Sequence, residues 1–514
     1  MKNKTQKALT GIPFFLFFTP LFFIHHSYNE LFGFIPALLV VKQTAYLFVF
    51  TLILYVIFIA LIKNKKRAAL TSFWILIFIL FFGLIHDSIK QLGIHAIFSR
   101  YSSVLTLLFL TFIAVIFLSY KNREKDCSRS YKFLNILFTI LLLVECIASL
   151  RLYQDFRQTH NLLDPRFKVL NEYNTAIHPK IHEKPDIFLL VFDAMSSSKS
   201  LQNTFQKDNS SLDSFLLKKG FYVVKNSKSN YNWTVHSVSA TLNMDYLPED
   251  NTFEINDPIN YFYGSKSILD NSLTRILKKE SYKVLQYQPV SFNNSDFPYE
   301  TFFESMLTNH FFFKTLPGRI YRDLFWNISK INVDFLTNYY EDLFNERNIR
   351  RKSEIDNITG LIKSSCDDTS KPKFVYGHYM IPHDPYTFDS SGNIKTGKQN
   401  LKISMTEKDE EDLYFEQVKY ANKIIIDLVD YIKTKNRKKT ILIVLGDHGY
   451  KYYKSDQVNE VFHNLNAIYF PDKNYSKLYD SLSNINIFRI ILNKEFGSSL
   501  NMLKDSSIYV AERE

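Results

Sequence analysis

Apolar residues are arranged very differently in the first 151 residues and in the rest of the chain. The first part contains five long apolar stretches, each close to the roughly 20 residues that cross the hydrocarbon core of a bilayer. In lipid such stretches form helices, because every backbone polar group must be satisfied within the segment. We therefore predict an N-terminal bundle of five transmembrane helices, at about 12–28, 44–62, 70–86, 101–120 and 133–150.

The charges between these stretches indicate their orientation. Basic residues precede the first stretch, follow the second and separate the fourth from the fifth: Lys2, Lys4, Lys7, Lys63, Lys65, Lys66, Arg67, Lys121, Arg123, Lys125, Arg129 and Lys132. The positive-inside rule places such loops in the cytoplasm. Five crossings then put the chain after Arg151 outside the cytoplasm, whereas four would reverse it.

One acidic residue interrupts the fifth apolar stretch. Glu145 lies near the end that we expect to face outward. A carboxyl group inside a membrane helix is a candidate for function, because burying it in lipid is costly. The structural alternative is that Glu145 reaches the outer interface or lines the bundle.

The rest of the chain has the pattern of a soluble α/β domain. After a connector at 152–184, short continuous apolar runs appear at 187–192, 221–224, 284–285, 374–376, 440–445 and 467–470. Such runs are typical of strands buried on both faces, and helical patterns such as 413–433 lie between them. We predict an extracytoplasmic α/β domain with a mostly parallel sheet over 185–514. The stretch 291–365 has no clear pattern, and we interpret it as an insertion over the site.

Composition excludes one class of partner. The sequence pI is about 9.1, but all of the net charge of +11 lies in residues 1–151, which contain 16 Lys and Arg against 5 Asp and Glu. The remaining residues are neutral overall, so no basic domain is present that would bind a nucleic acid.

Carboxylates and imidazoles follow several of the predicted strands. In open α/β sheets, ligands bind at the carboxyl ends of the strands. Oxygen and nitrogen ligands of this kind suit Zn²⁺ or Mn²⁺. The residues at these strand ends are Asp193, His378, His383, Asp447, His448 and His463. Each of them could instead have a purely structural role, as a helix cap, a turn residue or a hydrogen-bonded loop histidine.

A candidate nucleophile stands at the start of another predicted helix. Thr234 follows a strand and precedes a helical pattern, so it lies at or near the N-cap, where free backbone N–H groups favour a phosphate. A coordinated metal would lower the pKa of its hydroxyl group. Ser237, His236 and the run 196–198 compete with Thr234 for this role, and Thr234 could also serve only as a cap.

Together these motifs resemble a known family. A strand ending in Asp193 is followed by Ser-Asn-Tyr-x-x-Thr-x-x-Ser at 229–237, by His-x-x-x-Pro-His-x-Pro at 378–385, and by Gly-Asp-His-Gly at 446–449. This order is similar to the sulfatase-like branch of the alkaline phosphatase superfamily. With apolar spans in front, the chain resembles the membrane-bound phosphoethanolamine transferases and lipoteichoic acid synthases of bacterial envelopes.

The resemblance implies a chemistry and a location. One divalent metal, Zn²⁺ or Mn²⁺, would be held by Asp193, Thr234, Asp447 and His448, and the transferred group would contact His378, His383 and His463. Thr234 would take a phosphoethanolamine or phosphoglycerol unit from a phospholipid and pass it to a hydroxyl group of an envelope glycan or lipid. The chain would be a multi-pass protein of the bacterial inner (plasma) membrane, with a periplasmic or extracellular catalytic domain.

Two other functions stay open. The transferases commonly carry Glu where Asp193 stands, and Asp favours a sulfatase-like phosphodiesterase or sulfuric ester hydrolase. A formylglycine sulfatase needs Cys or Ser in a Cys/Ser-x-Pro-x-Arg setting, which neither Cys127 nor Cys366 has. The non-enzyme alternative is a transporter, or a degenerate binding module. A transporter should show broken helices or paired charges at the midplane of the membrane.

Overall fold

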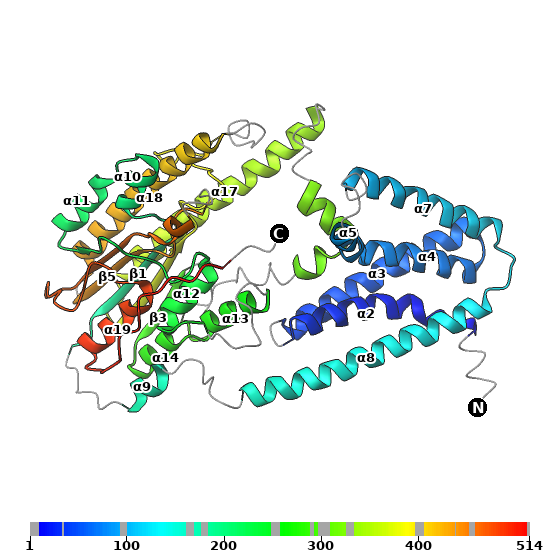
Figure 1. Ribbon diagram of the computed structural model, residues 1–514, viewed down its shortest axis with the longest axis horizontal. Coiled ribbons are helices and arrows are strands. Elements are labelled where there is room, and N and C mark those ends of the chain that lie inside the picture. Colours follow the sequence, from blue (N-terminus) through cyan, green and yellow to red (C-terminus); the bar gives the residue numbers. More distant parts are fainter. Residues whose placement is uncertain are drawn as a thin grey trace. The chain divides into compact units, whose positions relative to one another are not determined.

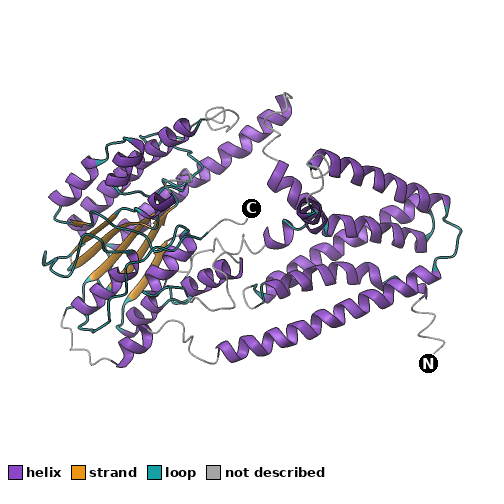
Figure 2. Ribbon diagram, viewed as in Figure 1, coloured by secondary structure: helices purple, strands orange, loops and turns teal. Residues whose placement is uncertain are grey.

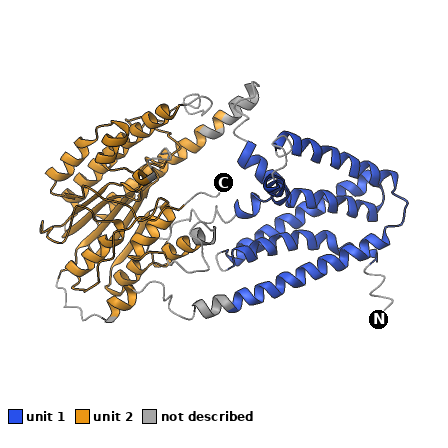
Figure 3. Ribbon diagram, viewed as in Figure 1, with its two compact units in different colours: residues 1–164, 304–328 blue, residues 165–303, 329–514 orange. Residues whose placement is uncertain are grey.

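The computed structural model divides into two compact units, formed by residues 1–164 with 304–328 and by residues 165–303 with 329–514 (Figure 3). The structure describes residues 10–32, 35–92, 100–160, 169–175, 183–247, 258–287, 292–296, 309–324, 334–395, 406–436, 438–451 and 458–510. Lys2, Lys4 and Lys7 and parts of the predicted connector, 161–168 and 176–182, lie outside these ranges. The patternless stretch 291–365 is shared between the units, because 304–328 belongs to the first one.

The first unit is a bundle of apolar helices (Figure 1). Its helices are α2 (Phe14–Glu30), α3 (Ala37–Ile62), α4 (Lys65–Leu80), α5 (Phe82–Gln91), α7 (Tyr101–Lys121) and α8 (Ser128–His160), followed later in the chain by α16 (Leu316–Arg319) and the π-helical turn η1 (Ile320–Leu324). Asn64 caps α4 by accepting hydrogen bonds from the backbone N–H groups of Lys66 and Arg67.

The bundle has fewer full-length spans than the five predicted. In the described part of the chain, α3, α7 and α8 are long and apolar enough to cross a membrane, and the bent pair α4 and α5 makes up to four. Helix α2 has 17 residues, about 25 Å at 1.5 Å per residue, against a hydrocarbon core of about 30 Å. Helices α4 and α5 meet at 56°, where the N–H of Gly83 donates to the carbonyl of Lys314 at 2.9 Å. A local hydropathy pattern does not detect such a break.

The basic turns lie at one end of the bundle. The hydroxyl of Tyr131, at the start of α8, donates to the carbonyl of Lys66 at 3.0 Å. The side chain of Asn64 donates to the carbonyl of Arg123 at 2.8 Å, which joins the α3–α4 turn to the α7–α8 turn. Helix α8 therefore begins at the basic end and leaves from the opposite end.

Glu145 faces α2. Its carboxylate accepts a hydrogen bond from the side chain of Asn29 at 2.7 Å and pairs with Nδ1 of His26 at 2.8 Å. Ser149, one turn later on α8, donates to the side-chain oxygen of Asn29 at 2.7 Å and contacts Nε2 of His25 at 2.7 Å. We name these five residues the α2–α8 polar cluster.

The second unit contains the predicted α/β domain. Its sheet has the order β2-β6-β5-β1-β4-β3, with β1 (Asp186–Phe192), β2 (Tyr222–Val223), β3 (Lys283–Tyr287), β4 (Lys373–Tyr379), β5 (Thr440–Gly446) and β6 (Asn466–Tyr469). Strands β3, β4, β1 and β5 are parallel, and β6 runs against β5. Every residue of β1, β4 and β5 is buried, as their continuous apolar runs predict.

Helices cover both faces of this sheet (Figures 1 and 2). One face carries α10 (Ser198–Phe205), α11 (Ser210–Lys218), α17 (Asp334–Ser365) and α18 (Glu407–Lys435), and the other carries α12 (Thr234–Asn243), α13 (Pro258–Leu269), α14 (Ser272–Lys279) and α19 (Asn484–Glu495). The remaining elements are α9 (Val169–Thr175) and the 3₁₀ turn η4 (Val458–Phe462). Phe188 and Leu190 of β1 pack against α17 and α18, and Phe374 of β4 contacts Phe488 of α19. The sheet is thus mostly parallel and enclosed, which confirms the predicted fold class.

Candidate metal centre

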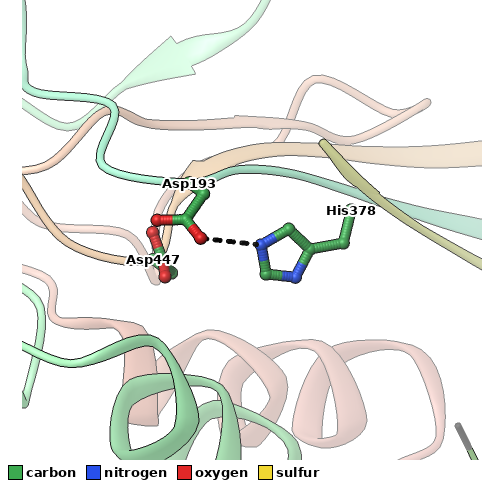
Figure 4. Close-up of side chains that lie close together, drawn as sticks. All are labelled: Asp193, His378 and Asp447. Carbon is green, nitrogen blue, oxygen red and sulfur yellow. Dashed lines mark ion pairs between the residues drawn. The ribbon is translucent and has the colours of Figure 1, made fainter. Parts of the chain in front are cut away.

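Three adjacent strands end at the same level, and this alignment builds the site. Phe192 of β1 is in register with Tyr379 of β4 and with Gly446 of β5. Asp193 and Asp447 therefore leave the sheet side by side, and His378 lies one residue before the end of β4. One ligand atom from each of these three buried side chains lies within 4.8 Å of the others (Figure 4). The structure thus places these three residues together at the carboxyl ends of parallel strands.

These side chains expose unsatisfied polar atoms to one another. Oδ1 of Asp193, Oδ2 of Asp447 and Nε2 of His378 are buried without a hydrogen-bond partner among the described residues. A buried polar atom is normally paired, because leaving it unpaired costs about 1–3 kcal/mol. A divalent cation would satisfy the two carboxylate oxygens, and Nε2 of His378 beside them could bind the cation or a group bound to it, so the residues present fit the implied metal.

His448 is a fourth side chain close to the two carboxylates. Its Nε2 lies 3.6 Å from Oδ1 of Asp193 and 3.6 Å from Oδ2 of Asp447. Two ligands at about 2.1 Å from a tetrahedral Zn²⁺ are about 3.4 Å apart. His378 lies slightly farther, with Nε2 at 3.9 Å from Oδ2 of Asp193.

Surrounding groups fix the orientation of these ligands. Oδ1 of Asp447 accepts hydrogen bonds from the backbone N–H groups of Ala194 at 3.0 Å and His448 at 2.9 Å, which leaves Oδ2 for the site. Nδ1 of His448 contacts the carbonyl of Gly449 at 2.7 Å, so this nitrogen carries the proton and Nε2 presents a lone pair. Such partners orient metal ligands and raise their basicity.

The charge states also suit a cation. Burial favours the neutral form of Asp193, but the neighbouring imidazoles, with His383 the strongest, outweigh it and lower the pKa of this carboxyl below its usual value. Burial lowers the pKa of His378 and of His448. Ionised carboxylates and neutral imidazoles are the forms that bind metals.

Thr234 stands at the edge of this group. It is the first residue of α12, with Trp233 in the N-cap position. Its Oγ1 lies 3.3 Å from Oδ2 of Asp193 and 3.4 Å from Nε2 of His448. The first turn of α12 leaves backbone N–H groups and the positive end of the helix beside this hydroxyl. The structure therefore brings together all four residues for which the sequence predicts metal binding.

His383 reaches the site through a braced loop. Its backbone N–H donates to the carbonyl of Asp193 at 3.1 Å, and its Nδ1 contacts the carbonyl of Asp384 at 2.7 Å. Burial would lower the pKa of His383, but the carboxylate of Asp193 raises it above its usual value. The loop 380–388 thus brings the imidazole of His383 to the edge of the sheet that carries the carboxylates.

Sequence reasoning missed the residues that hold this loop. Arg351 of α17 is partly buried, and its guanidinium donates hydrogen bonds to the carbonyl oxygens of Met380, His383 and Pro385. Gln417 of α18 donates to the carbonyls of Pro382 and His383, both at 3.1 Å. Arg351 lies in the stretch without a clear pattern. Arg351 stands in the basic run Arg-Arg-Lys at 350–352, so nothing in the sequence distinguishes it from a surface residue.

His463 differs from the other predicted residues. Its imidazole is partly exposed, and its Nε2 lies 4.0 Å from a carboxylate oxygen of Glu460. The carbonyl of His463 accepts a hydrogen bond from the N–H of Ser197 at 3.1 Å. In the described part of the chain, its side chain has no recorded contact with Asp193, Thr234, Asp447 or His448.

Lys451, which was not among the predicted site residues, places a positive charge beside the start of α12. Its Nζ lies 4.1 Å from the ring centroid of Trp233, the residue before Thr234. Lys451 also contributes to the lowered pKa of Asp193 and of His448. The ammonium group is therefore close enough to attract an anionic substrate to Thr234.

An enclosed, mostly parallel sheet with carboxylates, imidazoles and a hydroxyl at its strand ends is the arrangement of an α/β protein with a ligand site, and these residues could hold a metal. The family model described as "Sulfatase" matches residues 185–493, more than half of the chain. The chain therefore belongs to the sulfatase family and is an enzyme. The predicted family is confirmed.

The chain is also similar to several solved structures. The periplasmic domain of phosphoethanolamine transferase EptC from Campylobacter jejuni is 12% identical, with a TM-score of 0.38 over 61% of this chain and 90% of that one. The zinc complex of the corresponding Escherichia coli domain, EcEptC, is 11% identical, with a TM-score of 0.37 over 61% and 84%. An alkaline phosphatase superfamily protein from Vibrio parahaemolyticus is 14% identical, with a TM-score of 0.37 over 64% and 74%. The comparison with curated proteins finds no match.

Proposed function

We propose that the chain is a metal-dependent membrane transferase that moves a phosphoethanolamine- or phosphoglycerol-type group from a phospholipid to an envelope glycan or lipid. The observation that carries the proposal is the position of Thr234, whose hydroxyl lies within 3.4 Å of both Asp193 and His448. A threonine at this place also argues against a formylglycine sulfatase, since formylglycine is made from Cys or Ser.

The proposed metal ligands are Asp193, Thr234, Asp447 and His448. When bound, Zn²⁺ or Mn²⁺ would supply a Lewis acid that lowers the pKa of the Thr234 hydroxyl and offsets phosphoryl charge. His378 and His383 are proposed to contact the transferred group, together with His463 after a movement of its side chain. The imidazole of His383, whose pKa is raised by Asp193, and the ammonium of Lys451 suit a phosphoryl group that carries negative charge.

The reaction proceeds in two balanced steps. Thr234 loses its proton, its Oγ1 forms a bond to phosphorus, and the bond from phosphorus to the diacylglycerol oxygen breaks, so that diacylglycerol leaves with a proton. An acceptor hydroxyl then bonds to the same phosphorus and loses its proton. The bond to Oγ1 breaks, and Thr234 regains its hydrogen.

The apolar helices suit a lipid donor. Enzymes that hold the reacting groups together gain a large effective concentration, and a membrane anchor restricts the catalytic unit to the surface that holds the donor. In the first unit α8 leaves the bundle opposite the basic turns. The positive-inside rule then favours a catalytic unit outside the cytoplasm of a bacterial inner membrane.

Product analysis tests the proposal against hydrolysis, which Asp193 in place of Glu favours. Purified protein is reconstituted with Zn²⁺ or Mn²⁺ in vesicles of phosphatidylethanolamine and phosphatidylglycerol, and the lipid products are identified. A transferase releases diacylglycerol and leaves the head group on the protein or on an added glycolipid. Water-soluble phosphoethanolamine or glycerol phosphate, formed at the same rate with and without the acceptor, would instead establish a hydrolase.

A further inference from the structure

One segment within the range of the sulfatase-family match belongs to the first unit, which contains the apolar helices and is called the membrane unit below. Residues 304–328 lie between β3 and α17, inside the range 185–493 that defines the family match. The structure groups them with the apolar helices. The part that it describes, 309–324, contains α16 and η1 and is called here the interfacial segment.

The interfacial segment is attached to three helices. Each attachment involves a charged side chain of the segment and a polar side chain of the bundle. The pairs are Lys314 with Glu30 of α2, Arg319 with Asp87 of α5, and Asp323 with the hydroxyl of Tyr101 of α7. Glu30 ends α2 and Tyr101 begins α7, so all three contacts lie at the end of the bundle opposite the basic turns.

Backbone packing shows that this attachment is close. The N–H of Gly83 donates to the carbonyl of Lys314 at 2.9 Å. A Cβ atom at position 83 would lie 2.9 Å from that carbonyl oxygen and 3.1 Å from Nε of Arg319. A glycine is required for this approach, so the segment is an integral part of the bundle at the bend between α4 and α5.

The outer surface of the segment is apolar and aromatic. Phe312, Ile320 and Tyr321 are 39%, 38% and 55% exposed, while Arg322 pairs with the neighbouring Asp323. Exposed aromatic rings at the ends of membrane helices, beside a long cationic side chain, are typical of the phospholipid headgroup layer. The surface of α7, which begins at the same place, is apolar and exposed along its length, as lipid contact requires.

We propose that the interfacial segment rests in the headgroup layer of the leaflet opposite the basic turns, with Phe312, Ile320 and Tyr321 in contact with lipid. The catalytic unit is then tied to the membrane twice, by α8 and by a segment that enters the chain between β3 and the strand that carries His378. This inference concerns the location of a surface. It holds whether the enzyme transfers or hydrolyses, and whichever donor it uses.

Spin-label accessibility tests the proposal on the full chain in vesicles of phosphatidylethanolamine and phosphatidylglycerol. Cys146 is exposed and is replaced by Ala, whereas Cys127 and Cys366 are buried, and burial raises the pKa of the Cys366 thiol to about 11. A nitroxide is then attached at Tyr321→Cys. Leu110→Cys on α7 serves as the lipid-facing control and Leu217→Cys on α11 as the control in water, since these residues are 56% and 58% exposed.

The readout is the ratio of collisions with oxygen, which concentrates in lipid, to collisions with a water-soluble nickel complex. We expect the ratio at position 321 to exceed that at position 217 several-fold and to lie below or at that of position 110. A ratio equal to that at position 217 would overturn the proposal. Ile320→Cys repeats the measurement if the first variant does not fold, and the Cys146→Ala protein without an added cysteine must give no signal.

Discussion

The α2–α8 polar cluster and the strand-end site contain the same kinds of groups in opposite states. In the membrane unit, both oxygens of Glu145 are bonded, by His26 and Asn29, and Ser149 satisfies the oxygen of Asn29. At the strand ends, Asp193, Asp447 and His378 each keep one buried atom without a partner in the described residues. The polar atoms of the α2–α8 polar cluster are hydrogen-bonded to one another, whereas the strand-end site has buried polar atoms that a bound ligand would have to satisfy.

Whether the buried polar atoms have hydrogen-bond partners distinguishes a structural polar cluster from a ligand-binding one. A carboxylate in a membrane helix invites a functional interpretation, yet the bonds of Glu145 are all used in joining α2 to α8. Three orphaned buried atoms at the end of parallel strands cost stability, and a protein retains them for ligand binding. The contrast supports a structural role for Glu145 and the proposed metal site at the strand ends, and four predictions test the account.

The largest expected effect comes from removing a strand-end carboxylate. Asp447→Asn should lower activity at least about 100-fold, because changing even the outer partners of metal ligands costs 10- to 100-fold. Metal content and initial rates measure the effect. Asp412→Asn, in a surface pair with Lys207, is the matched control and should retain both. Full activity in a metal-free Asp447→Asn protein would refute the site.

Metal addition should stabilise only a protein with an intact strand-end site. At a free metal concentration of 100 times Kd, Zn²⁺ or Mn²⁺ should raise the free energy of unfolding by about 2.7 kcal/mol. Thermal unfolding of the detergent-purified protein, with and without chelator, measures the shift. Asp193→Asn should abolish the shift, whereas Glu145→Gln should leave it unchanged. A shift lost in Glu145→Gln would contradict the contrast between the two clusters.

Arg351 should act through the loop that carries His383. Arg351→Met should reduce kcat by about 10- to 100-fold, since a displacement of about 1 Å in a catalytic group can cost 100-fold. Metal affinity should be unchanged, and Arg351→Lys should recover part of kcat by donating to some of the same carbonyls.

The neighbouring Lys352 provides the control for this prediction. It pairs with Asp356 and contacts the hydroxyl of Tyr420 at the surface. Lys352→Met should therefore leave kcat and KM unchanged. Equal losses in the Arg351 and Lys352 variants, or a loss of bound metal in Arg351→Met, would show that α17 acts on overall folding.

The smallest expected effect concerns the α2–α8 polar cluster. A double-mutant cycle with Glu145→Gln and His26→Phe should give a coupling in unfolding of about 0.6 kcal/mol and at most about 1.7 kcal/mol, the mean and the maximum found for hydrogen bonds between membrane helices. Turnover of folded protein should be unaffected. A large loss of turnover with unchanged stability would instead make Glu145 a functional residue.

The sequence predicted the part of the site that depends on strand ends. Asp193 and Asp447 follow continuous apolar runs, and parallel strands in register bring their carboxyl ends together, so local patterns were sufficient. Thr234 was predicted because helix starts have their own signals. The roles given to these residues, and to His378, His383 and His463, stay predictions.

Other features depended on packing between distant segments. The hydropathy of 70–86 gives no sign that α4 ends at Leu80, because the bend involves Lys314, more than 200 residues later. Arg351 resembles a surface residue until α17 is packed against the loop 380–388. The attachment of 309–324 to the bundle likewise rests on pairs such as Arg319 with Asp87, which no local pattern contains.

The most direct test of the central claim is the intact mass of the protein after incubation with Zn²⁺ or Mn²⁺ and phospholipid vesicles, beside Thr234→Ala. The account predicts a mass gain of one phosphoethanolamine or phosphoglycerol unit on the wild type and none on the variant. The same gain on both proteins, or no gain on wild-type protein that has bound metal and releases diacylglycerol, would contradict Thr234 as the covalent carrier.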